Sequence, residues 1–403
     1  MSDSHRSPEF QVDEELAGWM CDIRRAIHQY PELSYQEYKT RTFVSEKLRE
    51  IGVNQQAELA RTGLVATING HDELSGEEAP PCVALRADMD ALPVEEKTGL
   101  SFASRKEGIM HACGHDGHVA ILLGAASLLA REKLPGRVKL IFQPAEEKGN
   151  GAKLVIEEGG LAGVKAIFAG HIDRHFEVGQ IAAEPGLICA YTDPFKIKIF
   201  GRGGHASRPH ETVDSIVVAS LLVMSIQTLV SREVNPSFPT VVSVGRIQGG
   251  TAGNVIAEEA VLEGTIRSTH PDVRAQIING LSRMVASMES LYNARAEIIY
   301  GEGLPPVINH PAAAELAREA ATLVTGERRV VAQLYPSLGG EDFAYYLQEI
   351  PGCLVRFGAR KAELGEAPAH SPFFDFDEAV LPVGAAFLAQ VAWSALEKIG
   401  IFK

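Results

Sequence analysis

Hydrophobic and polar positions alternate between helical spacing and short continuous runs along the first half of the chain. Residues 14–30 and 40–51 carry apolar side chains at helical spacing, and Gly52 is placed to end the second helix. Four short apolar runs predict buried strands, at residues 64–68, 82–85, 138–142 and 164–169. Helical stretches separate several of these runs, which indicates an α/β fold whose mainly parallel sheet is covered on both faces.

The pattern changes in the middle of the chain. Strand-like alternation and helical spacing follow one another there as strand, helix, strand, strand, helix and strand, at residues 193–201, 214–230, 240–247, 260–266, 273–291 and 294–300. This order is typical of a small α+β domain of ferredoxin-like type. We therefore expect a catalytic domain made of residues 1–190 and 305–403, interrupted by an inserted domain at residues 191–304.

Composition and charge narrow the class of protein. A length of 403 residues favours two domains, and a formal charge of -14 without a Lys/Arg block argues against a nucleic-acid or anionic-membrane partner. The five cysteines show no paired spacing, which favours a reducing compartment. The first eight residues lack an apolar signal core and no segment approaches a membrane span, so we expect a cytoplasmic protein.

The densest group of reactive side chains lies at residues 110–118. His111, Cys113, His115, Asp116 and His118 directly precede an apolar run that predicts a buried helix. Such polar side chains are costly to desolvate unless a metal or a substrate compensates them, and a cysteine beside histidines favours an ion such as zinc. Either Cys113 or His115 alone would suit a packing cysteine or a helix cap, but together they indicate a metal site.

Further candidates follow the predicted strands. Asp88 and Asp90 follow the second strand, Glu146 and Glu147 the third, and His171 the fourth. Because α/β sheets bind ligands beyond the carboxyl ends of their strands, these groups are expected to converge. Two adjacent carboxylates can divide labour, one as a ligand and the other as a general base. Asp88 and Asp90 could be ligands, could orient a ligating histidine, or could cap a helix.

Four more residues have weaker signals. His370 could be a ligand or a surface histidine, and His205 after a glycine-rich turn could stabilise an oxyanion or be a turn residue. Asn254 and Arg267 could anchor a substrate carboxylate, or could be a turn residue and a surface charge.

Several motifs resemble, in order, those of the two-metal aminoacylase/carboxypeptidase family. The similarity is greatest to its branch of hippurate hydrolases, indole-acetyl-amino-acid hydrolases and N-acyl-amino-acid amidohydrolases. The motifs lie at residues 24–28, 31–33, 86–93, 110–118, 142–147, 170–171, 201–207, 264–267, 339–343 and 369–373.

The resemblance implies a site and an assembly. The ligands of two divalent metal ions, zinc or manganese with cobalt as a further possibility, would be Cys113, His115, Glu147, His171 and His370. Glu146 would be the general base, with Asp88 behind the ligands. His205 would reach a neighbouring subunit across a homodimer formed by the inserted dimerisation or lid domain, and Asn254 and Arg267 would bind substrate.

We therefore expect hydrolysis of the amide bond of N-acyl-amino acids by a metal-activated water. A carboxypeptidase or dipeptidase acting on short peptides remains an alternative, and the polar segment 172–176 departs from the family pattern in a way that concerns substrate preference. A non-catalytic metal-binding relative would not need Glu146. A thiol-redox role for Cys113 would need a resolving cysteine in the flanking segment, where there is none.

Overall fold

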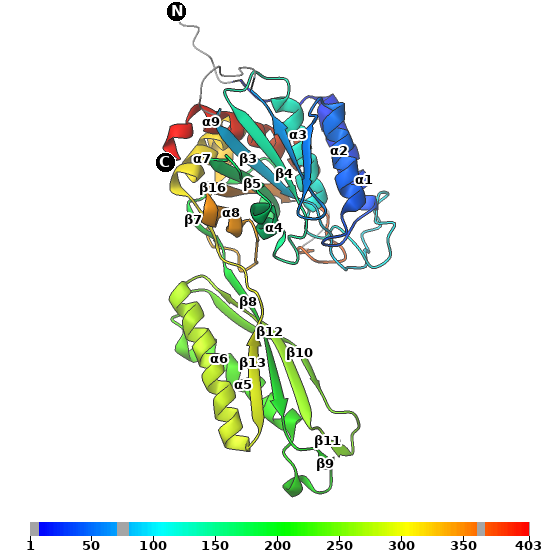
Figure 1. The fold of residues 1–403 in the computed structure, drawn as a ribbon, viewed down its shortest axis with the longest axis vertical. Helices are drawn as coiled ribbons and strands as arrows, with labels where there is room; N and C mark the ends of the chain where they lie inside the picture. Colours follow the sequence, from blue (N-terminus) through cyan, green and yellow to red (C-terminus); the bar gives the residue numbers. More distant parts are fainter. Residues whose placement is uncertain (1–7, 71–79, 361–366, 403) are drawn as a thin grey trace, which may run out of the picture. The chain divides into compact units, whose positions relative to one another are not determined.

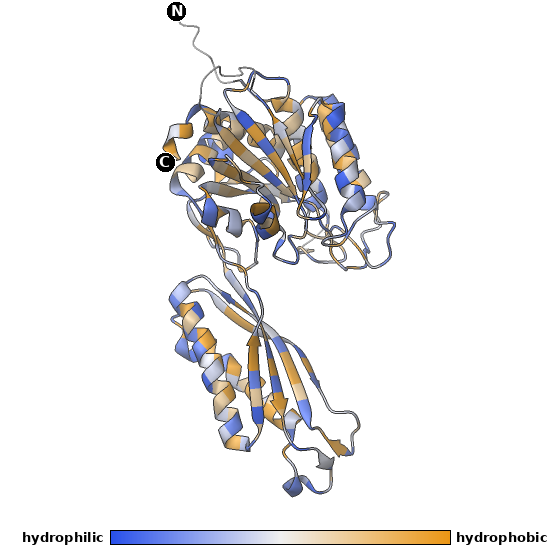
Figure 2. Ribbon diagram, viewed as in Figure 1, coloured by the Kyte–Doolittle hydropathy of each residue, from blue (hydrophilic) through white to orange (hydrophobic). Residues whose placement is uncertain are grey.

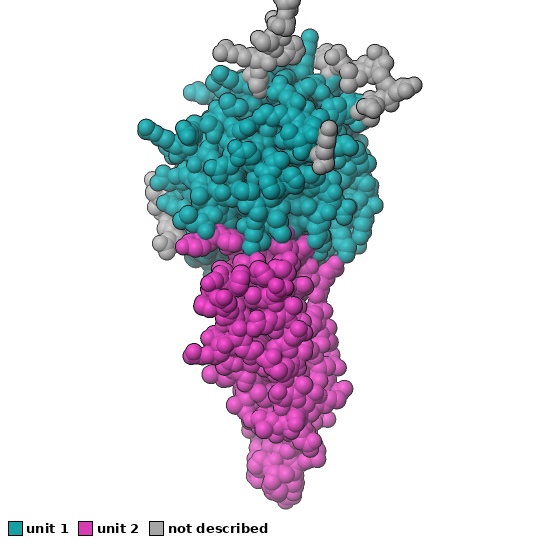
Figure 3. Space-filling view, turned by 90° about the vertical axis from the view of Figure 1, so that its left-hand side faces the viewer, with its two compact units in different colours: residues 1–188, 307–334, 342–403 teal, residues 189–306, 335–341 magenta. Residues whose placement is uncertain are grey.

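A computed structural model describes residues 8–70, 80–360 and 367–402, so most of the N-terminal stretch considered for a signal core lies outside the described residues. The chain forms two compact units (Figure 3). Unit 1 comprises residues 1–188, 307–334 and 342–403, and unit 2 comprises residues 189–306 and 335–341. The segment 335–341 thus groups with unit 2, whereas the sequence pattern had assigned it to the second part of the catalytic domain.

Unit 1 is built on an eight-stranded sheet (Figure 1). Its strands, in spatial order, are β1 (Gln55–Leu59), β2 (Gly63–Ile68), β4 (Arg137–Gln143), β3 (Cys82–Asp88), β5 (Ala166–Glu177), β16 (Gly352–Arg360), β6 (Ile181–Ala182) and β15 (Val330–Val331). The central strands β4, β3, β5 and β16 run parallel, whereas β1, β2 and β4 pair antiparallel and so do β16 and β6. The sheet is therefore mixed, with a parallel centre, and not mainly parallel throughout as the alternating pattern suggested.

Helices bury the central strands of this sheet. They are α1 (Glu14–Gln29), α2 (Tyr38–Glu50), α3 (His115–Leu129), α4 (Gly151–Glu157), α7 (Pro311–Thr325), α8 (Ala344–Glu349) and α9 (Val380–Glu397). Helices α3 and α9 pack against each other and against β3 and β5. Every residue of α3 is buried, whereas α1 and α2 alternate hydrophilic and hydrophobic positions (Figure 2) because each has one face in solvent.

Unit 2 has the strand and helix order expected from the sequence. Its elements are β8 (Tyr191–Phe200), β9 (Gly204–His205), α5 (Ser215–Thr228), β10 (Thr240–Gly249), β11 (Val255–Ile256), β12 (Glu259–Ser268), α6 (Pro271–Tyr292) and β13 (Arg295–Tyr300). The four long strands form an antiparallel sheet in the order β10-β12-β8-β13, which is the ferredoxin-like arrangement. Helices α5 and α6 pack against each other and on this sheet. Short strands β7 (Gly186–Cys189) and β14 (Val307–Asn309) lie where the chain passes between the units.

Two segments are long and apolar enough to cross a membrane by length and composition, residues 215–233 and 380–397. The second is α9, whose apolar side chains fill the core of unit 1 together with those of α3. The first is α5 with its C-terminal extension, which packs one side on the sheet of unit 2 through Val218, Leu222 and Ile226. Burial in a core accounts for the apolar composition of α9 and for the apolar residues on one side of α5.

Candidate metal centre

Four segments of unit 1 carry the candidate ligands. Cys113 lies in the turn before α3, and His115 is the first residue of that helix, directly after Gly114 in the left-handed conformation (φ 91°). Glu146 and Glu147 follow β4, and His370 lies in the loop before α9, where its backbone N–H donates to the carbonyl oxygen of Ala112 at 2.7 Å. Backbone bonding thus places the loop that carries His370 beside the turn that carries Cys113.

His171 is the exception to the strand-end pattern. It lies inside β5, which continues to Glu177, and does not follow the strand as the apolar run had suggested. Because Arg86 of β3 pairs with Ala169 of β5, His171 is level with Asp88, the last residue of β3. It therefore reaches the same edge of the sheet even though β5 extends further alongside β16.

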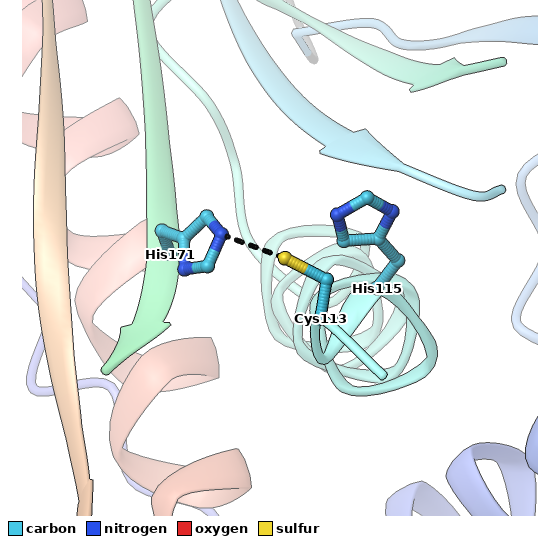
Figure 4. Close-up of side chains that lie close together, drawn as sticks. All are labelled: Cys113, His115 and His171. Carbon is cyan, nitrogen blue, oxygen red and sulfur yellow. Dashed lines mark hydrogen bonds between the residues drawn. The ribbon is translucent and has the colours of Figure 1, made fainter. Parts of the chain in front are cut away.

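The side chains of these residues form overlapping groups. Cys113 Sγ lies 3.6 Å from His171 Nε2, and Figure 4 shows the thiol directed at that ring with His115 nearby. His370 Nε2 lies 3.5 Å from Glu147 Oε1, and His115 Nε2 lies 3.9 Å from Glu147 Oε1. Within the described residues, the potential ligand atoms of Cys113, His115 and His171 fall within 4.8 Å of one another, and so do those of Cys113, Glu147 and His370. Cys113 belongs to both groups, so these residues could hold two divalent ions, with Cys113 a candidate ligand of either.

Two buried polar atoms support this fit. In the described part of the chain His115 Nε2 and Glu147 Oε1 are inaccessible to solvent and have no hydrogen-bond partner, which is costly unless a cation occupies the space between them. In the rings of His115 and His171, Nδ1 already has a hydrogen-bond partner. Nδ1 of His115 donates to the carbonyl oxygen of Asp90, and Nδ1 of His171 donates to the carbonyl oxygen of Ile172. Both Nε2 lone pairs therefore face the cluster, which is the usual orientation of ligating histidines.

The protonation states also suit a cation. Burial and the nearby Glu147 carboxylate raise the pKa of the Cys113 thiol to about 12, so it keeps its proton until a metal displaces it. Burial, His118 and Arg356 hold the pKa of His171 well below its usual value, which keeps this ring neutral and able to ligate. Burial would lower the pKa of His115, but the carboxylate of Asp88 and the contact with Asp90 outweigh it and raise that pKa. The protonated ring is thus stabilised in the metal-free protein, and a metal ion that binds Nε2 has to displace that proton.

Asp88 lies beside the cluster, and the histidine that it contacts most closely is His118, which is not among the candidate ligands. Its Oδ1 accepts from Nδ1 of His118 at 2.6 Å, and its Oδ2 accepts from Nη1 of Arg86 at 2.6 Å. His118 Nε2 in turn accepts from the backbone N–H of Ile172 at 2.9 Å, next to the candidate ligand His171. Asp88 therefore acts on the position of His171 through His118, while His115 Nε2 lies 3.8 Å from its Oδ2.

Unit 2 contains the three remaining candidates, of which two are neighbours and the third lies apart. They are His205, Asn254 and Arg267. His205 on β9 pairs with Val255 of β11, and the backbone N–H of Ala206 donates to the carbonyl oxygen of Asn254 at 3.2 Å, so His205 and Asn254 are neighbours. The His205 ring is exposed, and its Nδ1 accepts from the backbone N–H of Ser207. Arg267 is half-buried near the C-terminal end of β12, whereas Asn254 precedes the N-terminal end of that strand.

Sequence patterns gave no sign of a buried ionic cluster behind the 113–115 turn. Arg24 of α1 donates from Nε to Asp116 at 2.9 Å and from Nη2 to Asp375 at 2.7 Å, and its guanidinium lies over the rings of Phe102 and Phe376. Three segments distant in the chain thus meet at one side chain. The motifs at residues 24–28 and 110–118 contained Arg24 and Asp116, but no sequence pattern paired the two residues or added Asp375.

His111, the first polar residue of the 110–118 segment, does not join the candidate ligands. Its ring is buried, and burial lowers its pKa to about 4. Neither ring nitrogen has a hydrogen-bond partner among the described residues.

A largely buried group of candidate Cys, His and Glu ligands with a further carboxylate beside it is typical of a metal-dependent hydrolase. Comparisons with known proteins give the same class. Residues 84–394 match the model of peptidase family M20/M25/M40. The chain is 41% identical over 388 residues to N-acetyl-L-cysteine deacetylase of Bacillus subtilis, covering 96% of this chain and 89% of that protein. It is also 42% identical to thermostable carboxypeptidase 1 of Saccharolobus solfataricus, covering 94% and 95% of the two chains.

Two further matches extend this result. IAA-amino acid hydrolase ILR1-like 2 of Arabidopsis thaliana is 38% identical, over 97% of this chain and 88% of that protein. The crystal structure of the Bacillus subtilis YXEP protein, described as a dinuclear metal binding peptidase from the M20 family, matches with a TM-score of 0.81 and 36% identity, covering 96% of this chain and all of that one. The chain therefore belongs to peptidase family M20/M25/M40 and is a hydrolase of that family.

Proposed function

We propose that this protein hydrolyses the amide bond of N-acyl-amino acids and releases a free amino acid. The observation that carries the proposal is the placement of Glu146, whose Oε2 lies 3.9 Å from His115 Nε2 at the rim of the ligand group. Its neighbour Glu147 lies equally close to His115 Nε2, at 3.9 Å, but its Oε1 also lies 3.5 Å from Nε2 of a second candidate ligand, His370. We therefore assign ligation to Glu147 and proton transfer to Glu146.

The protein's own groups account for the proton movements of the reaction. The candidate ligands of the divalent ions are Cys113, His115, Glu147, His171 and His370. When bound, these ions would polarise the amide carbonyl and acidify a water molecule. Glu146 takes a proton from the attacking water and passes it to the leaving amine, so that it acts first as base and then as acid. His205 donates to the developing oxyanion, and Asn254 and Arg267 bind the substrate carboxylate.

The names of the relatives agree with this reaction. A deacetylase of N-acetyl-L-cysteine and an IAA-amino acid hydrolase both separate an acyl group from an amino acid. This chain matches each of them over nearly its whole length, so the same bond is the first candidate here.

The positions of the unit 2 residues favour a homodimer. Arg267 lies eight residues along β12 from Glu259, which is roughly 26 Å of extended strand, whereas His205 and Asn254 belong to the opposite end of this unit. A single copy of unit 2 therefore cannot bring all three side chains to one substrate. We infer that His205 and Asn254 come from one protomer and Arg267 from its partner.

The surface of unit 2 suits such an assembly. Helix α5 exposes apolar side chains at helical spacing, with Val217 47%, Leu221 39% and Met224 70% accessible. Strand β10 is at the edge of the sheet, so its outward backbone groups are open to pairing with a second copy. A twofold dimer would bury both features together.

The metal and the compartment follow from ligand chemistry. A thiolate beside imidazoles favours zinc, and manganese or cobalt are alternatives for a site that also contains a carboxylate. None of the five cysteines, all among the described residues, forms a disulfide, which suits a reducing cytoplasm.

A carboxypeptidase or dipeptidase is the second candidate function, favoured by the 42% identity to the thermostable carboxypeptidase. The test is amino-acid release from N-acetyl, N-benzoyl and indole-acetyl amino acids and from dipeptides, using protein stripped with a chelator and reloaded with zinc, manganese or cobalt. Metal-dependent release from an N-acyl class supports the proposal. Release from dipeptides alone would replace it with the peptidase, and no release from metal-loaded protein would leave a non-catalytic metal-binding relative.

A further inference from the structure

Two buried carboxylates hold the backbone of the segment that carries Glu146 and Glu147. Asp90 Oδ1 accepts from the backbone N–H of Glu146 and Asp90 Oδ2 from that of Glu147, each at 3.0 Å. Glu37 Oε1 accepts from the backbone N–H of the preceding residue, Ala145, at 2.9 Å. Three consecutive amide groups are therefore bound by carboxylates from two other parts of the chain.

This segment has an unfavourable backbone conformation. Ala145 has φ 54°, in the left-handed region, which is unfavourable for a residue with a Cβ. The conformation turns the chain directly after β4, immediately before Glu146 and Glu147. Hydrogen bonds to charged acceptors are roughly twice as strong as neutral ones, so the two carboxylates can hold this turn.

Each of the two carboxylates also accepts a hydrogen bond from a side-chain hydroxyl. Ser34 Oγ donates to Asp90 Oδ2 at 2.7 Å, and Thr62 Oγ1 donates to Glu37 Oε2 at 2.6 Å. Both acids are buried, with accessibilities of 1% for Asp90 and 0% for Glu37. Both Asp90 oxygens accept from backbone N–H groups, and Asp90 belongs to none of the ligand groups found among the described residues.

Asp90 also connects this turn to the other side of the cluster. Its own carbonyl oxygen accepts from Nδ1 of His115 at 2.9 Å. One residue thus contacts the segment of the general base and the ring of a candidate ligand.

We propose that Asp90 and Glu37 are positioning residues that fix the directions of the Glu146 and Glu147 side chains by binding the amide groups of residues 145–147. The role of Glu146 in this statement rests on the proposed function, whereas the hydrogen bonds do not. Neither acid contacts the reacting atoms, so each acts only through the turn that it holds.

The two acids respond differently to the same chemical change. In Asp90→Asn the side-chain NH₂ group must face the N–H of either Glu146 or Glu147, because both oxygens of the acid accept from backbone. In Glu37→Gln the oxygen can still accept from Ala145 while the NH₂ group donates to Thr62 Oγ1, which can rotate to accept. Loss of charge is equal in the two variants, but loss of hydrogen bonding is not.

The first experiment measures hydrogen–deuterium exchange of the amides of residues 145–147 in metal-free protein. Asp90→Asn is expected to speed exchange at residue 146 or 147 at least tenfold, and Glu37→Met at residue 145, whereas Glu37→Gln and the control Ser34→Ala stay within threefold of wild type. Wild-type exchange in Asp90→Asn, or equal exchange in Glu37→Gln and Glu37→Met, would overturn the proposal. Should Asp90→Asn not fold, the two Glu37 variants decide alone.

The second experiment uses metal-loaded protein. A displacement of the base by about 1 Å can cost roughly 100-fold in rate. Asp90→Asn is therefore expected to lower kcat about 100-fold with KM within threefold, and to change the visible spectrum of the cobalt-loaded protein because Glu147 moves. An unchanged kcat and spectrum would contradict the proposal. Absence of turnover in wild type would instead contradict the proposed function, while the exchange rates would still test the positioning role.

Discussion

The Nδ1 atom of His115 donates to the backbone carbonyl oxygen of Asp90 at 2.9 Å and so directs the lone pair of Nε2 toward Glu146 and Glu147. A single backbone contact thereby fixes the tautomer and the direction of a candidate ligand. The carboxylate of the same Asp90 accepts from the two glutamate amides. The candidate ligand and the candidate base therefore share one support, and a change at Asp90 should affect both.

Cys113→Ala should lower metal content together with activity. Cys113 belongs to both ligand groups, so its loss removes a donor from each of two ions, and we expect binding at least roughly tenfold weaker, since even residues behind the ligands change affinity by this factor. Metal content after dialysis against a chelator checks this. Cys353→Ala, which removes a buried thiol from β16, is the matched control and should keep the wild-type content. Equal contents in the two variants would exclude Cys113 as a ligand.

The stability of the metal-free protein should fall as pH rises from about 6.5 to about 9, through His28. Burial lowers the pKa of His28, but its hydrogen bonds to Asp116 and Glu96 outweigh burial and raise that pKa from 6.5 to about 9. Below pH 6.5 the ring is protonated in both folded and unfolded states, and the stabilisation is complete. Between the two values only the folded state keeps the proton, so up to about 3 kcal/mol is lost.

Denaturant unfolding at several pH values checks the role of His28. His28→Gln cannot take up the proton, so it should lack this part of the pH dependence. Parallel stability curves for wild type and His28→Gln across this range would mean that His28 is not the responsible group.

Met224→Glu should convert the proposed dimer to a monomer. The substitution places a charge in the middle of the exposed apolar side of α5, where a partner would have to desolvate it. Light scattering after size-exclusion chromatography gives the mass directly. Leu291→Glu, at a similarly exposed apolar residue on α6, is the control and should leave the mass unchanged. A wild-type monomer, or a dimer in both variants, would exclude α5 as the interface.

Mixing two inactive variants should restore activity if His205 acts across the dimer. A heterodimer of Glu146→Gln and His205→Ala contains one site with an intact Glu146 that receives His205 from the other protomer. With random assortment about half of the dimers are mixed, so activity should return to about a quarter of the wild-type value. If His205 served its own protomer, the mixture would be as inactive as its components.

The sequence predicted the elements of both units well because their hydrophobic periodicity reflects burial. It placed His171 after its strand, since the apolar run ends at Ala169, but backbone pairing with β16 continues β5 to Glu177. The polarity of the side chains does not show whether the backbone of a polar segment pairs with a neighbouring strand. For the same reason no spacing could assign Asp90, because its partners are backbone amides that leave no trace in residue type.

The placement of the segment 335–341 illustrates the same limit. Its Pro, Ser and Gly residues predict a loop but do not show to which unit that loop belongs. Its assignment to unit 2 depends on contacts such as the backbone N–H of Ala190 with the carbonyl oxygen of Ser337, which join residues far apart in the chain.

The most direct test of the account is a metal titration of chelator-stripped wild type and Glu146→Gln in parallel, with metal content and amino-acid release from N-acyl-amino acids measured on the same samples. Glu146→Gln spares the candidate ligands but removes the base, whose contribution to such reactions is roughly 100- to 10,000-fold. Both proteins should bind two ions per chain, and only wild type should release amino acid as metal is added. Release by Glu146→Gln at close to the wild-type rate, or by metal-free wild type, would contradict it.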